Sequence, residues 1–272
     1  MPGFFSKKPR FPCSKLIQIY IMIIIKTHEE IRLMREAGRI TGEALLAGAE
    51  MVKPGVTTKQ IDEKIRQYIE KCGAKPSFLG YGGFPGSACI SVNEQVIHGI
   101  PSRHKVLEEG DIVKIDVGAY KNGFHGDSAN TFGVGRITDE AQRLIDATKK
   151  SFYLGVEAAS KEGARIGDIG AAVDGYVVSC GYSTVKKYVG HGVGRDLHED
   201  PNVPNYGTAG RGARLCRGMV IAIEPMVNAG LPEVKELPDG WTVLTKDGSL
   251  SAHYEHTVAL TENGPELLTK VD

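Results

Sequence analysis

The sequence predicts an α+β protein made of two similar halves, each with two helices followed by antiparallel strands. The chain has 272 residues, and its second half matches its first at a constant shift of 108 positions. Many matches in one register without a gap indicate an internal structural duplication. The matching pairs are Gly55 and Gly163, Ile61 and Ile169, Tyr68 and Tyr176, Cys72-Gly73 and Cys180-Gly181, Gly82 and Gly190, Gly110 and Gly218, and Asp116 and Glu224.

The duplication also bears on how the halves are arranged. We expect them at about 27–137 and 138–272, joined in one pseudo-twofold domain with a site between them that takes carboxylates from both. Two independent domains are the alternative. No linker rich in Pro, Gly or Ser lies near Thr138, which favours the single domain.

The first 21 residues differ in composition from the rest. They are basic, contain Pro9 and Pro12, and lead into an apolar stretch from Leu16 to Ile25. A signal peptide also has a basic start followed by an apolar stretch, but no small-residue cleavage site follows here. The apolar stretch is also too short to span a bilayer, which takes about 20 residues. We therefore expect residues 1–21 to be a dispensable leader, and Met22 to be the natural first residue of a catalytic domain that spans 22–272.

Two capping boxes mark the starts of the first two helices. Thr27 with Glu30, and Thr57 with Gln60, each place a hydroxyl at the N-cap and an acid or amide three residues later. Apolar residues then recur at helical spacing. This pattern predicts one helix that runs to about residue 47 and another that stops at Cys72-Gly73.

A β-hairpin is predicted to carry Asp116 and Asp127. Asn122-Gly123 between strand-like residues is the strongest short-range hairpin signal, because both turn positions need positive φ. With this turn Asp116 pairs with Ala129, and Asp127 points to the same face. Two carboxylates on one buried face need a cation between them or a proton on one of them. A solvated hairpin with two surface aspartates is the alternative.

Four further polar residues stand in strand-like or glycine-rich segments. They are His191 in YVGHGVG, His198 in DLHEDP, Glu224 in GMVIAIEP and Glu255 in AHYEHTVAL. Glu224 ends an apolar strand directly before a proline, and Glu255 lies in a β-like run; buried carboxylates in such places need partners. Taken alone, His191 fits a structural histidine, and Glu255 fits a strand residue that faces solvent. Together with the two aspartates, the set has four carboxylates, whose negative charges balance the positive charges of two divalent ions. Oxygen-rich ligation with a single imidazole and no thiolate favours Mn²⁺ or Fe²⁺ and also accepts Co²⁺ or Zn²⁺.

Composition narrows the partners and the compartment. The chain has 33 basic residues (Lys and Arg) and 33 acidic residues (Asp and Glu), so its net charge is zero. The overall charge therefore gives no reason to expect nucleic-acid or membrane partners. The five cysteines form no C-x-x-C pair, which indicates a reducing, cytoplasmic setting.

The ordered motifs resemble the methionine aminopeptidases of type I, which have the pita-bread fold. The motifs are HGI-P around His98, two aspartates with ten residues between them (D-x10-D) ending in FHGD, then GHGVG-x3-HEDP, IEPM and YEHT. The match covers about 22–272. The resemblance implies a central dinuclear metal site. It implies five metal ligands, of which Asp127 and Glu255 bridge the ions: Asp116, Asp127, His191, Glu224 and Glu255.

The resemblance also implies roles in catalysis and substrate binding. His98 and His198 handle the substrate, with His198 donating to the carbonyl oxygen, and Glu224 is the candidate to carry the proton. The family's methionine pocket falls on Tyr81, Phe84, Cys89, His98 and Trp241. A flexible thioether packs well against aromatic edges and a thiol. Leu197 departs from the family, because many relatives have an aromatic residue there, and this leaves one wall of the pocket open to question.

The implied function is removal of the initiator methionine from nascent polypeptides whose second residue is small. The resemblance implies a cytoplasmic monomer in transient contact with the ribosome. A proline-specific peptidase of the same fold is one alternative, although such relatives carry a large additional N-terminal domain. A non-catalytic pita-bread binding module is the other, although such relatives lack ligands and all five are present here.

Overall fold

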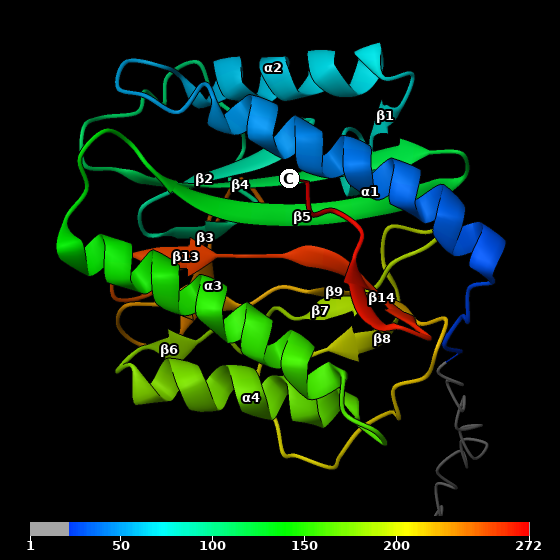
Figure 1. Ribbon diagram of the computed structural model, residues 1–272. Coiled ribbons are helices and arrows are strands. Elements are labelled where there is room, and N and C mark those ends of the chain that lie inside the picture. Colours follow the sequence, from blue (N-terminus) through cyan, green and yellow to red (C-terminus); the bar gives the residue numbers. More distant parts are fainter. Residues whose placement is uncertain (1–21, 272) are drawn as a thin grey trace, which may run out of the picture.

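This computed structural model describes residues 22–271, which fold into four α-helices and four antiparallel sheets (Figure 1). The predicted leader, residues 1–21, lies outside the described residues, so its dispensability stays a prediction. The helices are α1 (His28–Ala49), α2 (Thr58–Lys71), α3 (Asp139–Ala159) and α4 (Ile166–Ser179), with a short 3-10 turn η1 (Tyr81–Gly83).

The strands fall into one sheet of four, one of five and two of three. The four-stranded sheet contains β1 (Lys75–Pro76), β2 (Ala88–Val92), β4 (Ile112–Lys121) and β5 (Phe124–Gly133). The five-stranded sheet has the order β15 (Gly264–Leu267), β14 (His256–Thr261), β9 (Val220–Ile223), β7 (Gly190–Gly192) and β8 (Glu199–Val203). One three-stranded sheet has the order β13 (Ser251–His253), β10 (Met226–Asn228) and β6 (Ser183–Thr184). The other has the order β11 (Val234–Glu236), β12 (Val243–Thr245) and β3 (Gln95–Ile97).

The predicted duplication is confirmed in the bounds of the elements. Both ends of α2 and α4 are related by the shift found in the sequence, and so are both ends of β1 and β6. An isolated bridge between Thr57 and Val106 recurs at the same shift between Arg165 and Arg214. The prediction of pseudo-symmetric helix-helix-sheet halves is therefore correct.

Both predicted capping boxes form. The Thr27 side chain accepts from the Glu30 backbone N–H, and the Thr57 side chain does the same for Gln60, so α1 and α2 begin where the sequence predicts. The first helix ends at Ala49, slightly beyond the predicted end. The caps satisfy backbone donors that an uncapped helix leaves unpaired.

Each helix pair packs on its own apolar cluster, and the strands lie between the two helix pairs. In Figure 1, α1 and α2 run above the strands and α3 and α4 below them. Ile61 and Ile65 of α2 are buried with Ile115 of β4, whereas Phe152 of α3 is buried in another cluster with Ile221 of β9. The space between these cores is where a shared site can form.

The predicted hairpin is confirmed as β4 and β5. Asp116 pairs with Ala129, and the turn residues Asn122 and Gly123 have φ of 54° and 85°. Asp127 is buried, with 4% of its surface exposed, so the solvated-hairpin alternative is wrong. Helix α1 packs directly on β5: a Cβ on Gly126 would lie 2.9 Å from the Cα of Gly38.

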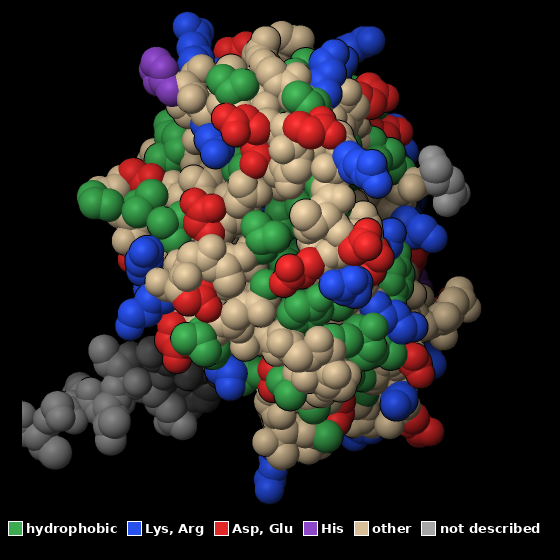
Figure 2. All heavy atoms as spheres, turned by 90° about the vertical axis from the view of Figure 1, so that its left-hand side faces the viewer, with side chains coloured by type: hydrophobic (Ala, Val, Ile, Leu, Met, Phe, Trp, Pro, Cys, Tyr) green, Lys and Arg blue, Asp and Glu red, His purple; other side chains and the backbone are tan. Residues whose placement is uncertain are grey.

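The surface carries charges of both signs. On the face in Figure 2, acidic and basic side chains are interspersed rather than gathered into one field, as the equal totals of 33 acidic and 33 basic residues suggest. Within residues 22–271, no helix combines the length and apolar character needed to cross a membrane.

Candidate metal centre and substrate pocket

All the predicted site residues line one cavity between the two halves. It has a volume of about 150 Å³, and it also takes in Phe78 and Leu197. The predicted residues along its wall are Tyr81, Phe84, Cys89, His98, Asp116, Asp127, His191, His198, Glu224, Trp241 and Glu255. The structure therefore brings together side chains that are more than half the chain apart in sequence.

The five predicted metal ligands lie on or directly beside different strands. Asp116 and Asp127 lie on β4 and β5, and His191 is the middle residue of β7. Glu224 follows β9 directly and precedes Pro225, which cannot donate to the ladder.

Glu255 differs slightly from its predicted setting. It lies in a two-residue break between β13 and β14 rather than within a continuous strand. Its backbone N–H donates to the carbonyl of Ala129 at 2.8 Å, and the Ala129 N–H donates back at 3.3 Å. This pair of bonds holds Glu255 of the second half against β5 of the first.

The spacing of the ligand atoms fits cations between them. His191 Nε2 lies 3.7 Å from Asp127 Oδ2 and 3.6 Å from Glu224 Oε1, too far for hydrogen bonds. One oxygen each of Asp116, Asp127 and Glu255 is buried without a hydrogen-bond partner among the described residues. Buried carboxylate oxygens without donors are costly unless a metal ion takes the donors' place.

Two groups of ligand atoms are close enough to hold an ion each. In one, atoms of Asp127, His191 and Glu255 lie within 4.8 Å of one another, and in the other the same holds for Asp116, His253 and Glu255. Because Glu255 belongs to both, the geometry fits two neighbouring divalent ions. The donor set of carboxylates and imidazole suits Mn²⁺, Fe²⁺, Co²⁺ or Zn²⁺.

Electrostatics lead to the same conclusion. Burial raises the pKa of Asp116 to about 7, and burial and neighbouring carboxylates raise the pKa of Asp127 and Glu255 well above the ordinary range. The side chains thus resist ionisation until positive charge arrives. Burial lowers the pKa of His191 to about 3, which keeps its imidazole neutral and able to bind a metal.

The two predicted substrate histidines stand on the rim of the metal centre. The Tyr81 hydroxyl lies 2.8 Å from Nδ1 of His198, which leaves Nε2 of that ring for a bound molecule. The rings of His198 and His191 have centroids 4.1 Å apart. His98 has a φ of 56°, and such strain in a residue other than glycine is typical of functional sites.

The apolar part of the cavity is an aromatic cluster. Phe84 and Trp241 meet edge to face with centroids 5.1 Å apart, and Cys89 is buried beside them. Burial raises the pKa of the Cys89 thiol well above its usual value, so the thiol stays neutral. Leu197 is the residue whose departure from the family pattern left one wall of the pocket open to question. Its side chain is 2% exposed and packs in this cluster, where it forms part of the pocket wall.

Sequence reasoning missed two residues of the site, Phe78 and His253. Phe78 is buried in the aromatic cluster, and no pattern in its segment singles it out. His253 stands two residues before Glu255, and the period of two in a strand could have placed both on one face.

A buried ion pair lies next to His198 and was also missed. Lys26 Nζ is 2.5 Å from Glu199 Oε2, and both side chains are 3% exposed. The other Glu199 oxygen accepts from the Arg195 backbone N–H at 2.8 Å. The pair therefore ties the segment before α1 to the loop that carries His198.

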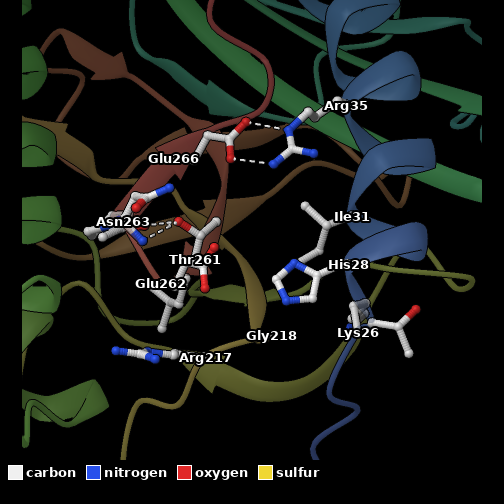
Figure 3. Close-up of a pocket in the computed structure, with 14 residues that line it drawn as sticks. Lys26, His28, Ile31, Arg35, Arg217, Gly218, Thr261, Glu262, Asn263 and Glu266 are labelled. Atoms are coloured by element: carbon white, nitrogen blue, oxygen red, sulfur yellow. Dashed lines mark hydrogen bonds and ion pairs between the residues drawn. The ribbon is translucent and has the colours of Figure 1, made fainter.

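A larger cavity of about 540 Å³ opens elsewhere, at the start of α1 beside the β14–β15 hairpin (Figure 3). Arg35 on its wall is paired with Glu266 at 2.6 Å, and His28 and Arg217 are exposed. None of the predicted metal ligands faces it. The chemistry therefore belongs to the smaller cavity.

Comparisons with known proteins agree with this geometry. The profile of metallopeptidase family M24 matches residues 32–262. A methionine aminopeptidase of Clostridium acetobutylicum is 56% identical over 248 residues, which cover 91% of this chain and 99% of the relative.

Solved structures are similar as well. The methionine aminopeptidase of Thermotoga maritima superposes with a TM-score of 0.90 at 45% identity, over 92% of this chain and all of that one. A prolidase of Pyrococcus furiosus superposes with a TM-score of 0.73 at 28% identity, over 92% of this chain but only 66% of the prolidase. The pita-bread fold is thus shared with both kinds of enzyme.

Proposed function

The chain belongs to metallopeptidase family M24, and we propose that it is an aminopeptidase that removes the N-terminal methionine from polypeptides whose second residue is small. One observation carries this proposal: the candidate metal ligands and an apolar pocket of aromatic residues and a thiol line the same cavity. The metal centre alone suits any hydrolase of this fold. The pocket beside it accounts for the choice of methionine.

Two divalent ions bind in the cavity, with Asp116, Asp127, His191, Glu224 and Glu255 as the proposed ligands. When bound, the ions supply Lewis-acid activation of the scissile carbonyl and of water. The protein's part is to hold the carboxylates in place. The paired backbone bonds between Ala129 and Glu255 support this positioning.

Glu224 is the proposed carrier of the proton. Burial raises its pKa well above the ordinary value in the absence of metal. Once bound cations hold it as a carboxylate, it is placed to take a proton from water and return it to the leaving amine. His198 donates through Nε2 to the carbonyl oxygen as negative charge develops there. His98 contacts the scissile amide, and burial lowers the pKa of its ring to about 4, so the ring is neutral.

The substrate methionine side chain lies among Tyr81, Phe84, Cys89 and Trp241. A thioether is polarisable and flexible, so it packs favourably against aromatic edges and a neutral thiol. At Gly82, a Cβ would lie 3.3 Å from the Trp241 ring. A side chain at position 82 would therefore press on the Trp241 wall of this pocket.

The alternatives have less support. A proline-specific peptidase is disfavoured because the prolidase is only 28% identical to this chain, whereas the methionine aminopeptidase of Clostridium acetobutylicum is 56% identical. A non-catalytic binding module is disfavoured because the ligands are present and clustered.

The cellular setting follows from the substrate. We propose that the protein acts in the cytoplasm on nascent chains, in transient contact with the ribosome. Cys72, Cys89, Cys180 and Cys216, the cysteines among the described residues, are all free thiols. We propose further that it acts as a monomer.

Peptide hydrolysis tests the specificity. We expect Met-Ala-Ser and Met-Gly peptides to lose methionine faster than matched Leu-, Arg- or Xaa-Pro peptides. Faster turnover of the second group would overturn the proposal.

Thiol alkylation tests the pocket. It should inactivate the enzyme slowly, because the Cys89 thiol is buried and neutral, and bound methionine should protect. The Cys89→Ser variant is the matched control and should resist, since the other described cysteines lie outside the cavity. Equal inactivation of both proteins would exclude Cys89 from the pocket.

A further inference from the structure

His253 is a buried histidine that the proposed mechanism does not use. It ends β13 and is 2% exposed. Its Nε2 lies 3.7 Å from Glu224 Oε2 and 3.8 Å from Glu255 Oε2. Neither ring nitrogen has a hydrogen-bond partner among the described residues. An imidazole in this state faces two proposed metal ligands and has no other partner.

The relation of His253 to these carboxylates repeats that of His191. His191 Nε2 lies 3.7 Å from Asp127 and 3.6 Å from Glu224 Oε1, so each oxygen of Glu224 faces one imidazole. These distances exceed a hydrogen bond of about 2.7–3.2 Å. They stay below about 4.2 Å, the largest separation of two donors that each lie about 2.1 Å from one ion.

His256 shows that burial alone does not produce an unpartnered ring. It lies three residues further on and is also buried, with 8% exposed. Its Nδ1 is 2.8 Å from the Thr269 hydroxyl, and its Nε2 is 3.1 Å from the Tyr254 hydroxyl. The structure thus satisfies one buried histidine and leaves its neighbour facing the metal centre.

We propose that His253 is a sixth protein ligand, which binds the ion on the Asp116 side. This assignment rests on the proposed dinuclear function. It gives each ion one imidazole: His191 with Asp127 and Glu255, and His253 with Asp116 and Glu255. A neutral nitrogen donor at the Asp116-side position shifts the metal preference of that position from Mn²⁺ toward Co²⁺ and Zn²⁺.

Proton NMR of the protein loaded with two Co²⁺ ions tests the ligand count. An imidazole bound to Co²⁺ gives a strongly shifted N–H signal that disappears in D₂O. The wild type should show two such signals, the His253→Gln variant one, and the His256→Gln control two. A single signal in the wild type, or two in His253→Gln, would overturn the proposal. The wild-type count needs no variant to fold.

Calorimetric titration with Co²⁺ and Mn²⁺ gives an independent readout. In His253→Gln, the dissociation constant for one of the two Co²⁺ ions should rise by at least about 10–100-fold, the loss produced by removing a partner that only supports a ligand. The dissociation constant for Mn²⁺ should rise less. An unchanged Co²⁺ affinity would contradict the assignment. No peptide is needed, so failure to cleave Met-Ala-Ser would count against the proposed function and not against this ligand.

Discussion

The two halves of the molecule share a scaffold but divide the chemistry. Helices α2 and α4 have matching bounds, yet the first half brings two aspartates on one hairpin, whereas the second brings its ligands on separate elements. Asp116 and Glu224 occupy equivalent positions in the duplication. Two carboxylates alone cannot hold two ions, so neither half is sufficient. The duplication supplies the frame, and the site arises only where the halves meet.

The bonds between the halves differ from those within each half. Within a half, apolar helix faces pack on sheets. Between the halves, apolar contacts such as those of Phe124 with Val220 are joined by buried polar contacts near the site. Lys26 pairs with Glu199, and the Asp127 N–H donates to the Thr257 hydroxyl at 2.9 Å. Such contacts demand accurate geometry, because a buried polar group that loses its partner is costly.

The largest effect on stability should come from the buried tie between the halves. Lys26→Met leaves the Glu199 carboxylate buried without its partner, and we expect a loss of about 3–5 kcal/mol in the free energy of unfolding. Urea denaturation measures this loss. Arg35→Met is the control, because the Arg35–Glu266 pair is exposed and should contribute about 1 kcal/mol or less. Equal losses in both variants would show that the buried tie has no special weight.

His198 tests the second half's part in catalysis. His198→Ala should lower kcat about 10²–10³-fold, since a donor to the developing oxyanion is lost. The variant should keep its bound metal and its affinity for methionine, which elemental analysis and calorimetry measure. Purification without metal, or turnover at the wild-type rate, would remove His198 from the proposed role.

The pH dependence of metal binding tests the first half's aspartate. Burial raises the pKa of Asp116 to about 7, so a proton competes with the metal below that pH. The affinity should fall as pH falls through 7, by up to about tenfold per pH unit for each proton displaced. Burial lowers the pKa of His191 to about 3, so this imidazole adds nothing in that range. Equal affinity at pH 8 and pH 5.5 in calorimetric titrations would contradict this account.

The smallest expected effect compares equivalent helix caps. Thr57→Ala removes the hydroxyl that accepts from the Gln60 N–H and should cost about 1 kcal/mol of unfolding free energy. At the matching position the Arg165 backbone N–H donates to Asp168, and Arg165→Ala keeps that bond. We therefore expect a change within about 0.5 kcal/mol there. A larger loss for Arg165→Ala in denaturant titrations would reverse the comparison.

Local patterns predicted much of the fold and placed the candidate residues together. The capping residues Thr27 and Thr57 and the Asn122-Gly123 turn act over a few positions, so their consequences can be deduced from neighbours in sequence. The Lys26–Glu199 pair spans 173 positions, and no local signal announces it. The same holds for the division of the strands into four sheets.

His253 shows a different limit. Its strand spacing from Glu255 was visible, but a histidine in a strand is usually structural, and only the missing hydrogen-bond partners distinguish it from His256. Such information exists only in the packed structure.

The central claim is that the metal centre needs carboxylates from both halves. Its most direct test is the metal content of the wild type, Asp116→Asn and Glu224→Gln after equilibrium dialysis against the same free Co²⁺ concentration. The two residues are equivalent in the duplication, one from each half. We expect two ions per chain in the wild type and fewer than two in either variant, with the fold intact by circular dichroism. Two ions retained in either variant would contradict a centre shared by the halves.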